Sequence, residues 1–418
     1  MTVRANQLAG LADAIHRVSR FDAPADSVLT TFFRAYAAMG QRDRAFVAEG
    51  TYAYLRRKRS IDALAATTDP HKLALCILVR ELGHSVRELQ PLVREHDAAW
   101  LADFKFRARG ALPPAIASDL PDWLWERVRA AFGDSDAMGL ARALQTQAPF
   151  DLRTNPLKTT RDQALDALRA DHLAADATPY APLGLRIVGR TSLVNHPWLV
   201  DGRIEVQDEG SQLVGHVVAP RRTEMVVDFC AGAGGKTLLL GALMRSQGRL
   251  YAFDVSAKRL SKLAPRLTRS GLSNVHPQVI AHERDAKVKR LAGKIDRVLV
   301  DAPCTGTGTL RRNPDLKWRQ TPADVAELTA KQARILDGAS TLVKAGGRLV
   351  YATCSILPEE NDAIVADFLA AHPTFEQKDA SAELAHAGIA VDTGPFLRLL
   401  PHRHGCDGFF AAILERTK

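Results

Sequence analysis

Two cysteines stand where chemistry rather than packing would place them. Cys304 follows residues 300–303 and Cys354 follows residues 351–353, so each comes just after a short apolar run. In a parallel α/β sheet the carboxyl ends of the strands open onto the ligand crevice. A lone thiol is more often an apolar filler. Two of them at strand ends predict a functional rather than a packing role, and the chemistry that would need two thiols there is left open by these positions alone.

A glycine-rich loop lies between an apolar run that ends at Asp228 and a leucine-rich helix. A P-loop would need glycine at position 230, which is Cys230, and the dinucleotide fingerprint would need glycine at position 237, which is Thr237. The remaining interpretation is the nucleoside-binding, Rossmann-like domain of S-adenosylmethionine enzymes. The candidate cofactor loop comprises Cys230, Ala231, Gly232, Ala233, Gly234, Gly235 and Lys236.

Two aspartates follow the next strands in the order that nucleoside binding requires. Asp254 ends the apolar run 249–253, where an acidic side chain can hold the ribose hydroxyls. Asp285 follows the third expected strand, where it or its neighbours would reach the adenine amino group. Either aspartate alone is more often a helix cap or turn residue. Their occurrence together and in order favours cofactor binding.

The composition suits a protein with a polyanionic partner. The chain has 418 residues, 46% of them apolar and 25% charged, which is ordinary for two or three globular domains. Its 56 Lys and Arg exceed 47 Asp and Glu, giving a net charge of +9. This balance predicts a nucleic acid as partner. A basic solvated surface is the alternative.

The cysteine and hydropathy patterns predict the compartment. The five cysteines are scattered and lack the two-residue spacing of zinc sites, so we expect reduced thiols and no metal ion. His402, His404 and Cys406 are interpreted as part of a loop rather than as a metal site. Residues 1–19 lack the apolar core of a signal peptide, and no later run is long enough to span a membrane. We therefore expect a soluble, cytoplasmic monomer.

Three segments differ in pattern. Residues 1–145 carry apolar side chains at helical spacing and predict an all-helical domain. Residues 146–215 mix extended pieces with one short helix and predict a small α+β module. Residues 216–418 alternate strand and helix, which predicts a parallel sheet with right-handed crossovers and an α/β fold class.

Individual elements follow from start and stop signals. Helices are expected to begin at Pro70 and after Pro121, and a helix before Leu55 is expected to end in the basic cluster 56–59. A further helix is expected from Pro322. The expected strands are 225–229, 249–254, 278–281, 297–301 and 349–353.

Basic residues in two places predict contact with RNA phosphates, and a solvated surface is an equal alternative for each. The small module carries Arg153, Lys158 and Arg161. The loop after Cys304 carries Arg311, Arg312, Lys317 and Arg319 around Trp318, which could stack on a base or be buried.

Several motifs together resemble one family, the RsmB/NOP/NSUN RNA cytosine-5 methyltransferases. The resemblance spans roughly 147–418, and the helical segment is similar, more weakly, to the NusB-like domain of the bacterial RsmB branch. The matching motifs are Asp228–Thr237, Asp301–Cys304, Thr353–Ser355, Pro358–Asn361 and the terminal Asp407–Phe410.

The resemblance implies a fold, a cofactor and residue roles. It implies a class I methyltransferase domain at 216–418 that uses S-adenosylmethionine, preceded by RNA-binding modules at 1–145 and 146–215. Cys354 is then the nucleophile that adds to C6 of cytosine, and Cys304 acts in its release. Asp301 would hydrogen-bond the base at N3 and the exocyclic amine and also line the cofactor site, with Lys236 approaching the O2 side.

Three functions remain open at this point. The resemblance to the RsmB branch favours 16S ribosomal RNA as substrate, and transfer RNA is the alternative within the same chemistry. A non-catalytic RNA-binding or ribosome-assembly factor would keep the fold without the reaction. The presence of Cys304, Cys354 and Asp301 argues against that reading.

Overall fold

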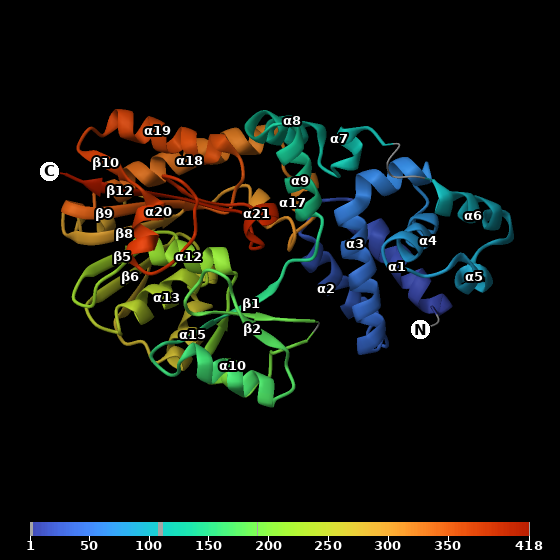
Figure 1. Ribbon diagram of the computed structural model, residues 1–418, viewed down its shortest axis with the longest axis horizontal. Helices are drawn as coiled ribbons and strands as arrows, with labels where there is room; N and C mark the ends of the chain where they lie inside the picture. Colours follow the sequence, from blue (N-terminus) through green and yellow to red (C-terminus); the bar gives the residue numbers. More distant parts are fainter. Residues whose placement is uncertain (1–2, 108–111, 190, 418) are drawn as a thin grey trace. The chain divides into compact units, whose positions relative to one another are not determined.

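The computed structural model describes residues 3–107, 112–189 and 191–417, which Figure 1 colours along the chain. They divide into two units. The helical unit comprises residues 1–147 together with 309–322, and the sheet unit comprises residues 148–308 together with 323–418. The second stretch of the helical unit, 309–322, is called the strap below.

The helical unit is built from helices that pack around a large apolar core and smaller apolar clusters. Leu11 and Ile15, Ile61 and Leu75 come from three of these helices and are fully buried in that core. The helices are α1 Ala5–Val18, α2 Ala25–Ala35, α3 Gln41–Ala65, α4 Pro70–Arg80, α5 Val86–Leu89, α6 Ala98–Phe106, α7 Pro114–Ala117, α8 Asp122–Phe132 and α9 Asp134–Leu144. The predicted all-helical pattern of this segment agrees with these elements.

Helix α4 begins at Pro70, as predicted, because the residue before it caps it. Asp69 Oδ1 accepts a hydrogen bond from His71 N at 2.9 Å, and proline fits a first-turn position whose N–H would be unpaired. Helix α3 differs from the prediction. It continues through the basic cluster 56–59 to Ala65, since Lys58 pairs one turn later with Asp62.

The strap packs inside the helical unit through helix α17, Leu316–Arg319. Lys317 is 3% exposed and its Nζ donates to Arg56 O at 2.9 Å. Trp318 Nε1 donates to Leu55 O at 3.2 Å. These two side chains are therefore structural, and their interpretation as part of an RNA track is wrong.

The sheet unit begins with a small antiparallel module. In the described part of the chain its strands run in the order β2-β3-β1-β4, and helix α10 packs on them through Ala164 and Leu168. Helix α10 starts with a capping box between Thr160 and Gln163. The elements are β1 Phe150–Thr154, α10 Arg161–Ala170, β2 Ala175–Ala177, β3 Gly184–Ile187, α11 Pro197–Val200 and β4 Ile204–Val206.

The large sheet has the strand order β10-β12-β9-β8-β5-β6-β7 among the described residues, with β11 paired to β12. The pairs from β9 to β7 are parallel, and those made by β12 are antiparallel. The strands are β5 Met225–Asp228, β6 Arg249–Asp254, β7 Val275–Val279, β8 Ile295–Asp301, β9 Val343–Thr353, β10 Phe375–Lys378, β11 Leu397–Leu399 and β12 Phe409–Arg416. This arrangement confirms the predicted α/β class with a Rossmann-like domain.

Helices cover both faces of the large sheet (Figure 1). Successive strand residues point to opposite faces, so Val227 packs with one set of helices and Val226 with the other. One face carries α16 Ala286–Lys289, α18 Pro322–Ser340 and α19 Asp362–Ala371. The other carries α12 Glu209–Val218, α13 Gly235–Leu243 and α20 Ala380–His386. Helices α14 Ala257–Leu260, α15 Leu263–Ser270 and α21 Pro401–His404 complete the unit.

Strand β7 lies three residues earlier than predicted. It spans Val275–Val279 and contains His276 and Pro277, which weaken the apolar pattern. Proline is tolerated there because β7 ends the sheet and one side of it needs no partner. Within the described ranges, no helix combines the length and the apolarity needed to cross a bilayer.

Candidate active site

The two cysteines predicted to do chemistry meet at the carboxyl edge of the large sheet. Strands β8 and β9 are parallel neighbours, with Asp301 opposite Ala352, so the turns that follow them start side by side. Cys304 Sγ and Cys354 Sγ lie 3.4 Å apart, and both side chains are partly buried. Neither forms a disulfide.

The environment of Cys304 keeps its proton in place. The contact with Cys354, together with burial, raises the pKa of the Cys304 thiol well above its ordinary value. The Glu360 carboxylate acts in the same direction. A protonated Cys304 is able to donate to the Cys354 sulfur, although either sulfur can be the donor in this contact.

A buried hydrogen-bond network fixes the two turns that carry the sulfurs. Glu360 Oε1 accepts from Thr305 N and from Gln332 Nε2, each at 2.9 Å. Gln332 Nε2 also donates to Pro303 O at 2.9 Å. On the other turn, Asn361 Nδ2 donates to Ser355 O at 3.0 Å. Neighbouring residues of one motif therefore hold both cysteine turns.

The two turns also touch directly through a glycine. Gly308 N donates to Cys354 O at 2.8 Å, and Gly408 N donates to Gly308 O at 2.8 Å. A Cβ at Gly308 would lie 2.2 Å from Gly408 O and 2.8 Å from Cys354 O, so only glycine fits. This close approach sets the separation of the two sulfurs.

Lys236 and Asp301 form a partly buried ion pair beside the cysteines. Lys236 Nζ lies 2.8 Å from Asp301 Oδ2. Burial alone would lower the pKa of Lys236, but the charge and hydrogen bond of Asp301 outweigh burial and raise that pKa. The ammonium also lies 5.3 Å from the centre of the Phe409 ring and interacts electrostatically with Cys354.

The glycine-rich loop joins β5 to α13 and is tied to Asp254. Gly232 and Gly234 adopt positive φ values of 55° and 85°, which glycine reaches without strain. Asp254 is 2% exposed, and its Oδ2 accepts from Gly232 N at 2.8 Å. Its Oδ1 accepts from Ser256 N at 2.7 Å, so the side chain lies at the end of β6 against the loop.

Asp228, the last residue of β5, carries a buried oxygen without a partner. Thr237 donates its hydroxyl to Asp228 Oδ2 at 2.6 Å, while Oδ1 has no hydrogen bond among the described residues. Burial raises the pKa of Asp228 to about 7, partly offset by the Thr237 hydrogen bond. When the Asp228 carboxyl is ionised, this buried oxygen beside the glycine-rich loop can accept a hydrogen bond from a bound ligand.

Two other candidates lie in different settings. Asp285 caps the short helix α16, accepting from Ala281 N and Lys287 N at 2.8 Å each, and these backbone bonds lower the pKa of its carboxyl. Cys230 is enclosed, and burial raises the pKa of its thiol far above the ordinary value. The structure thus brings Asp301, Cys304 and Cys354 together with Lys236, and places Asp285 outside that group.

Two arginines hold the cofactor loop, Arg153 from the small module and Arg266 from α15. Arg153 in β1 is 2% exposed, and its Nη1 donates to Gly235 O at 2.9 Å and to Gln207. Burial lowers the pKa of Arg153 to about 10. Arg266 Nη1 donates to Ala233 O at 2.7 Å while pairing with Glu205 of β4 at 3.0 Å. The predicted phosphate contact of Arg153 is wrong, because its guanidinium is buried.

Sequence reasoning missed three residues of this site. Asp228 and Glu360 stand inside quoted motifs but received no role, and their burial is the property that a linear pattern does not display. Gln332 lies in the middle of α18, 28 residues before Glu360, with no local signal beyond a polar side chain on a buried helix face.

Models of two known families match the chain. The 16S rRNA methyltransferase RsmB/F model matches residues 215–415, and the RsmF/B-like ferredoxin-like domain model matches residues 120–193. The chain is 38% identical over 301 residues to a probable ribosomal RNA small subunit methyltransferase B of Synechocystis sp.. It is 37% identical over 299 residues to the ribosomal RNA small subunit methyltransferase B of Sodalis glossinidius. These alignments cover 71% of this chain and 67% and 66% of the two relatives.

Solved structures agree with this assignment. The crystal structure of PH0851 superposes with a TM-score of 0.79 at 25% identity and covers 100% of both chains. A methyltransferase homolog protein from Pyrococcus horikoshii superposes with a TM-score of 0.62 at 27% identity, covering 74% of this chain and 100% of that one. From the extent of the sequence match and the fold that carries the paired cysteines, the chain belongs to the 16S rRNA methyltransferase RsmB/F family and is a methyltransferase.

Proposed function

We propose that this protein transfers a methyl group from S-adenosylmethionine to C5 of a cytosine in small-subunit ribosomal RNA. The observation that carries the proposal is the 3.4 Å approach of Cys304 and Cys354 beside a partly buried lysine–aspartate pair. A non-catalytic protein has no need to hold two thiols together at the edge of a sheet. In this proposal residues 1–145 and 146–215 bind RNA and residues 216–418 carry the reaction.

The residues around the glycine-rich loop suit the cofactor. The unpartnered Asp228 Oδ1 would accept from the cofactor's ammonium, and the first turn of α13 would offer backbone N–H groups. Asp254 Oδ2 would accept from a ribose hydroxyl, because Gly232 N occupies one of its lone pairs, while Oδ1 accepts from Ser256 N and Arg259 Nη2. When bound there, the cofactor supplies an electrophilic methyl group.

The attack on the base requires a thiolate near a positive charge. We assign Cys354 as the nucleophile that adds to C6, which makes C5 electron-rich enough to accept the methyl group. The Lys236 ammonium stabilises the Cys354 thiolate through their electrostatic interaction. Asp301, held by Lys236, accepts from N3–H and from the exocyclic amine of the protonated base.

Release reverses the covalent bond. Once C5 is methylated, its proton passes to a solvent water, the electrons of the C5–H bond re-form the C5–C6 double bond, and the electrons of the C6–S bond return to the Cys354 sulfur. Cys304 keeps its proton and donates to that sulfur, so it stabilises the departing thiolate. The two thiols thus have unequal roles.

The test is a set of three cysteine variants assayed with labelled S-adenosylmethionine and small-subunit ribosomal RNA from cells that lack the protein. We expect Cys354→Ala to show no transfer and no covalent RNA. Cys304→Ala should accumulate a protein–RNA adduct that survives denaturing electrophoresis. Cys304→Ser keeps a hydroxyl donor, so it should release RNA faster than Cys304→Ala.

Four results would contradict the proposal. Full activity of Cys354→Ala would show that Cys354 is not the nucleophile. Equal adduct levels in the two Cys304 variants would show that Cys304 does not act as a hydrogen-bond donor in release. Transfer to transfer RNA, with ribosomal RNA unmodified in the same assay, would change the substrate. No transfer by the wild-type protein to either RNA would leave only a binding function.

A further inference from the structure

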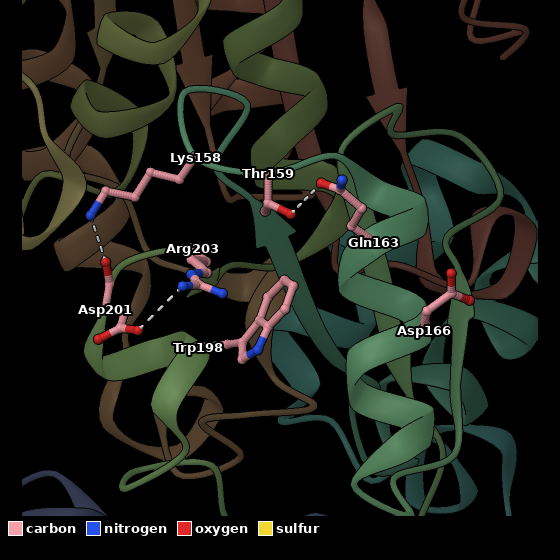
Figure 2. Close-up of a pocket in the computed structure, with 7 residues that line it drawn as sticks. All are labelled: Lys158, Thr159, Gln163, Asp166, Trp198, Asp201 and Arg203. Atoms are coloured by element: carbon pink, nitrogen blue, oxygen red, sulfur yellow. Dashed lines mark hydrogen bonds and ion pairs between the residues drawn. The ribbon is translucent and has the colours of Figure 1, made fainter.

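A hollow of about 770 Å³ opens on the small antiparallel module, where no residue of the proposed reaction lies. It is bordered by α10 on one side and by the segment around α11 on the other, as Figure 2 shows. The lining residues are Lys158, Thr159, Gln163, Asp166, Trp198, Asp201 and Arg203.

An indole and a guanidinium form the central wall of the hollow. The guanidinium carbon of Arg203 lies 5.0 Å from the centre of the Trp198 ring. Figure 2 shows the indole between Arg203 and the helix that carries Gln163 and Asp166. Trp198 is only partly buried against the module's core, so it presents aromatic surface beside a fixed cation. This pairing is suited to an unstacked base next to a phosphate.

Neighbouring cations are held by main-chain oxygens rather than by carboxylates. Lys158 Nζ donates to Asp201 O at 2.7 Å and to Arg269 O at 2.5 Å. Arg245 Nη1 donates to Pro156 O at 3.0 Å, and the backbone of Arg245 itself has a positive φ of 55°. Because carbonyl groups carry no net charge, these contacts leave the positive charge of Lys158 in place at the rim. The side chains are also fixed in place before any ligand arrives.

A tight turn builds this rim. Gly202 has a φ of 68°, and a Cβ there would lie 2.3 Å from Arg269 O. Only glycine therefore lets residues 201–203 approach the end of α15 closely enough for Lys158 to bridge both carbonyls. Asp201 pairs with Arg203 only loosely, at 3.9 Å between exposed groups, so the guanidinium can exchange this partner for a phosphate.

We propose that this hollow binds one unpaired nucleotide of a single-stranded RNA segment, with its base against Trp198 and the flanking phosphates on Arg203 and Lys158. The inference rests on the proposed function, since it assigns part of the RNA substrate to a subsite away from the cysteines. It also explains why a module without catalytic residues presents a cation over an aromatic ring.

The test measures binding of a labelled single-stranded RNA of about ten nucleotides to the full chain by fluorescence anisotropy, at several salt concentrations. Trp198→Ala should weaken binding about tenfold, as loss of one base–aromatic stack predicts, and Trp198→Phe should restore most of the affinity. Arg203→Ala should weaken binding and lower the slope of log Kd against log salt by about 0.7, the value for one phosphate contact on a single strand. Arg222→Ala removes an exposed arginine of the same unit outside the hollow and should change neither quantity.

The outcomes separate the subsite from the reaction. Wild-type affinity and salt slope in both Trp198→Ala and Arg203→Ala would overturn the proposal, even if the wild-type protein methylates RNA. If Trp198→Ala lowers the melting temperature, Trp198→Phe and Arg203→Ala still decide the question. Competition by an oligoglutamate peptide as strong as that by RNA would assign the hollow to acidic peptides instead. Failure of methyl transfer by the wild-type protein would refute the proposed function. The binding measurements would still decide whether the hollow binds a nucleotide.

Discussion

At the scale of single residues, the balance of charge under the glycine-rich loop is set by Asp228. Its carboxyl has an ordinary pKa of 3.8, which burial raises to about 7. Between about pH 4 and pH 7 the Asp228 carboxyl therefore keeps its proton in the folded protein without cofactor, whereas in the unfolded chain it is ionised. Stability contributed by this group is present below about pH 4 and is lost as the pH rises to about 7. A bound ammonium would favour the ionised form and remove this cost.

Asp228→Asn should separate stability from cofactor binding. Without cofactor, the variant should gain stability relative to wild type as the pH rises from 4 to 7, by at most roughly 3–4 kcal/mol. Its affinity for S-adenosylmethionine should nevertheless fall at pH 8, because an amide does not pair with the ammonium. Thermal denaturation over pH 4–8 and calorimetric titration measure the two effects. Unchanged cofactor affinity would exclude Asp228 from the binding site.

The residues at which chemistry was predicted are those whose type is distinctive in the sequence. Cys304 and Cys354 follow apolar runs, and parallel strands bring such positions together without further information. Arg153 shows the limit of this reasoning. Whether a charged side chain is exposed or supports a loop from beneath, as Arg153 does, depends on packing between distant segments.

At the scale of elements, strands β1 and β4 of the small module support the cofactor loop. The loop carbonyls of Gly235 and Ala233 accept from Arg153 and Arg266, and Glu205 on β4 orients Arg266. Arg153→Lys keeps the positive charge but replaces the planar guanidinium by an ammonium. The loop should therefore lose the hydrogen bond that Arg153 donates to it. We expect the Kd for S-adenosylmethionine to rise about tenfold, as for one charge-assisted hydrogen bond.

The control for this prediction is Arg222→Lys, the same exchange at an exposed position of the same unit. It should leave the Kd unchanged. If Arg153→Lys lowers the melting temperature but binds the cofactor as tightly as wild type, Arg153 supports the fold alone. A higher KM for the cofactor with unchanged kcat would agree with a positioning role.

The ends of helices and strands were predictable where an apolar run is continuous. They were not predictable where ion pairs or the position of a strand in the sheet set the end. Strands β6 and β8 end at Asp254 and Asp301, as predicted, because the polar residue coincides with the sheet edge. Helix α3 passes through the basic cluster since ion pairs such as Lys58 with Asp62 neutralise it. Strand β7 was displaced because an edge position accepts Pro277, which a sequence pattern counts against a strand.

At the scale of the whole molecule, the chain leaves the sheet unit after residue 308, enters the helical unit as the strap and returns at residue 323. The strap is anchored by Lys317, whose ammonium faces Asp119 and the arginines at 56 and 57. Burial lowers the pKa of Lys317 to about 7, from an ordinary 10.5. The unfolded chain thus binds more protons between these values, and stability rises with pH over that window.

Lys317→Met should make the helical unit more stable than wild type at pH 7. The gain should be roughly 2–4 kcal/mol and should shrink toward pH 10, where the wild-type amine is neutral in the folded protein and burial no longer costs a charge. Denaturation by urea at pH 7 and pH 10 measures the difference. Lys105→Met, at an exposed position of the same unit, should show no such pH dependence. A constant difference between the two pH values would mean that Lys317 is charged in the folded protein throughout.

The strap has a consequence for the order in which the protein is made. Residues 1–147 emerge from the ribosome first, but α17 and the hydrogen bonds of Lys317 and Trp318 belong to the same unit and emerge only after residues 148–308. During translation the helical unit must therefore wait, incomplete, until more than half of the sheet unit has been synthesised. The last buried side chains of the helical unit are synthesised shortly after Cys304. The helical unit can therefore complete its packing only after the turn that carries this cysteine has been made.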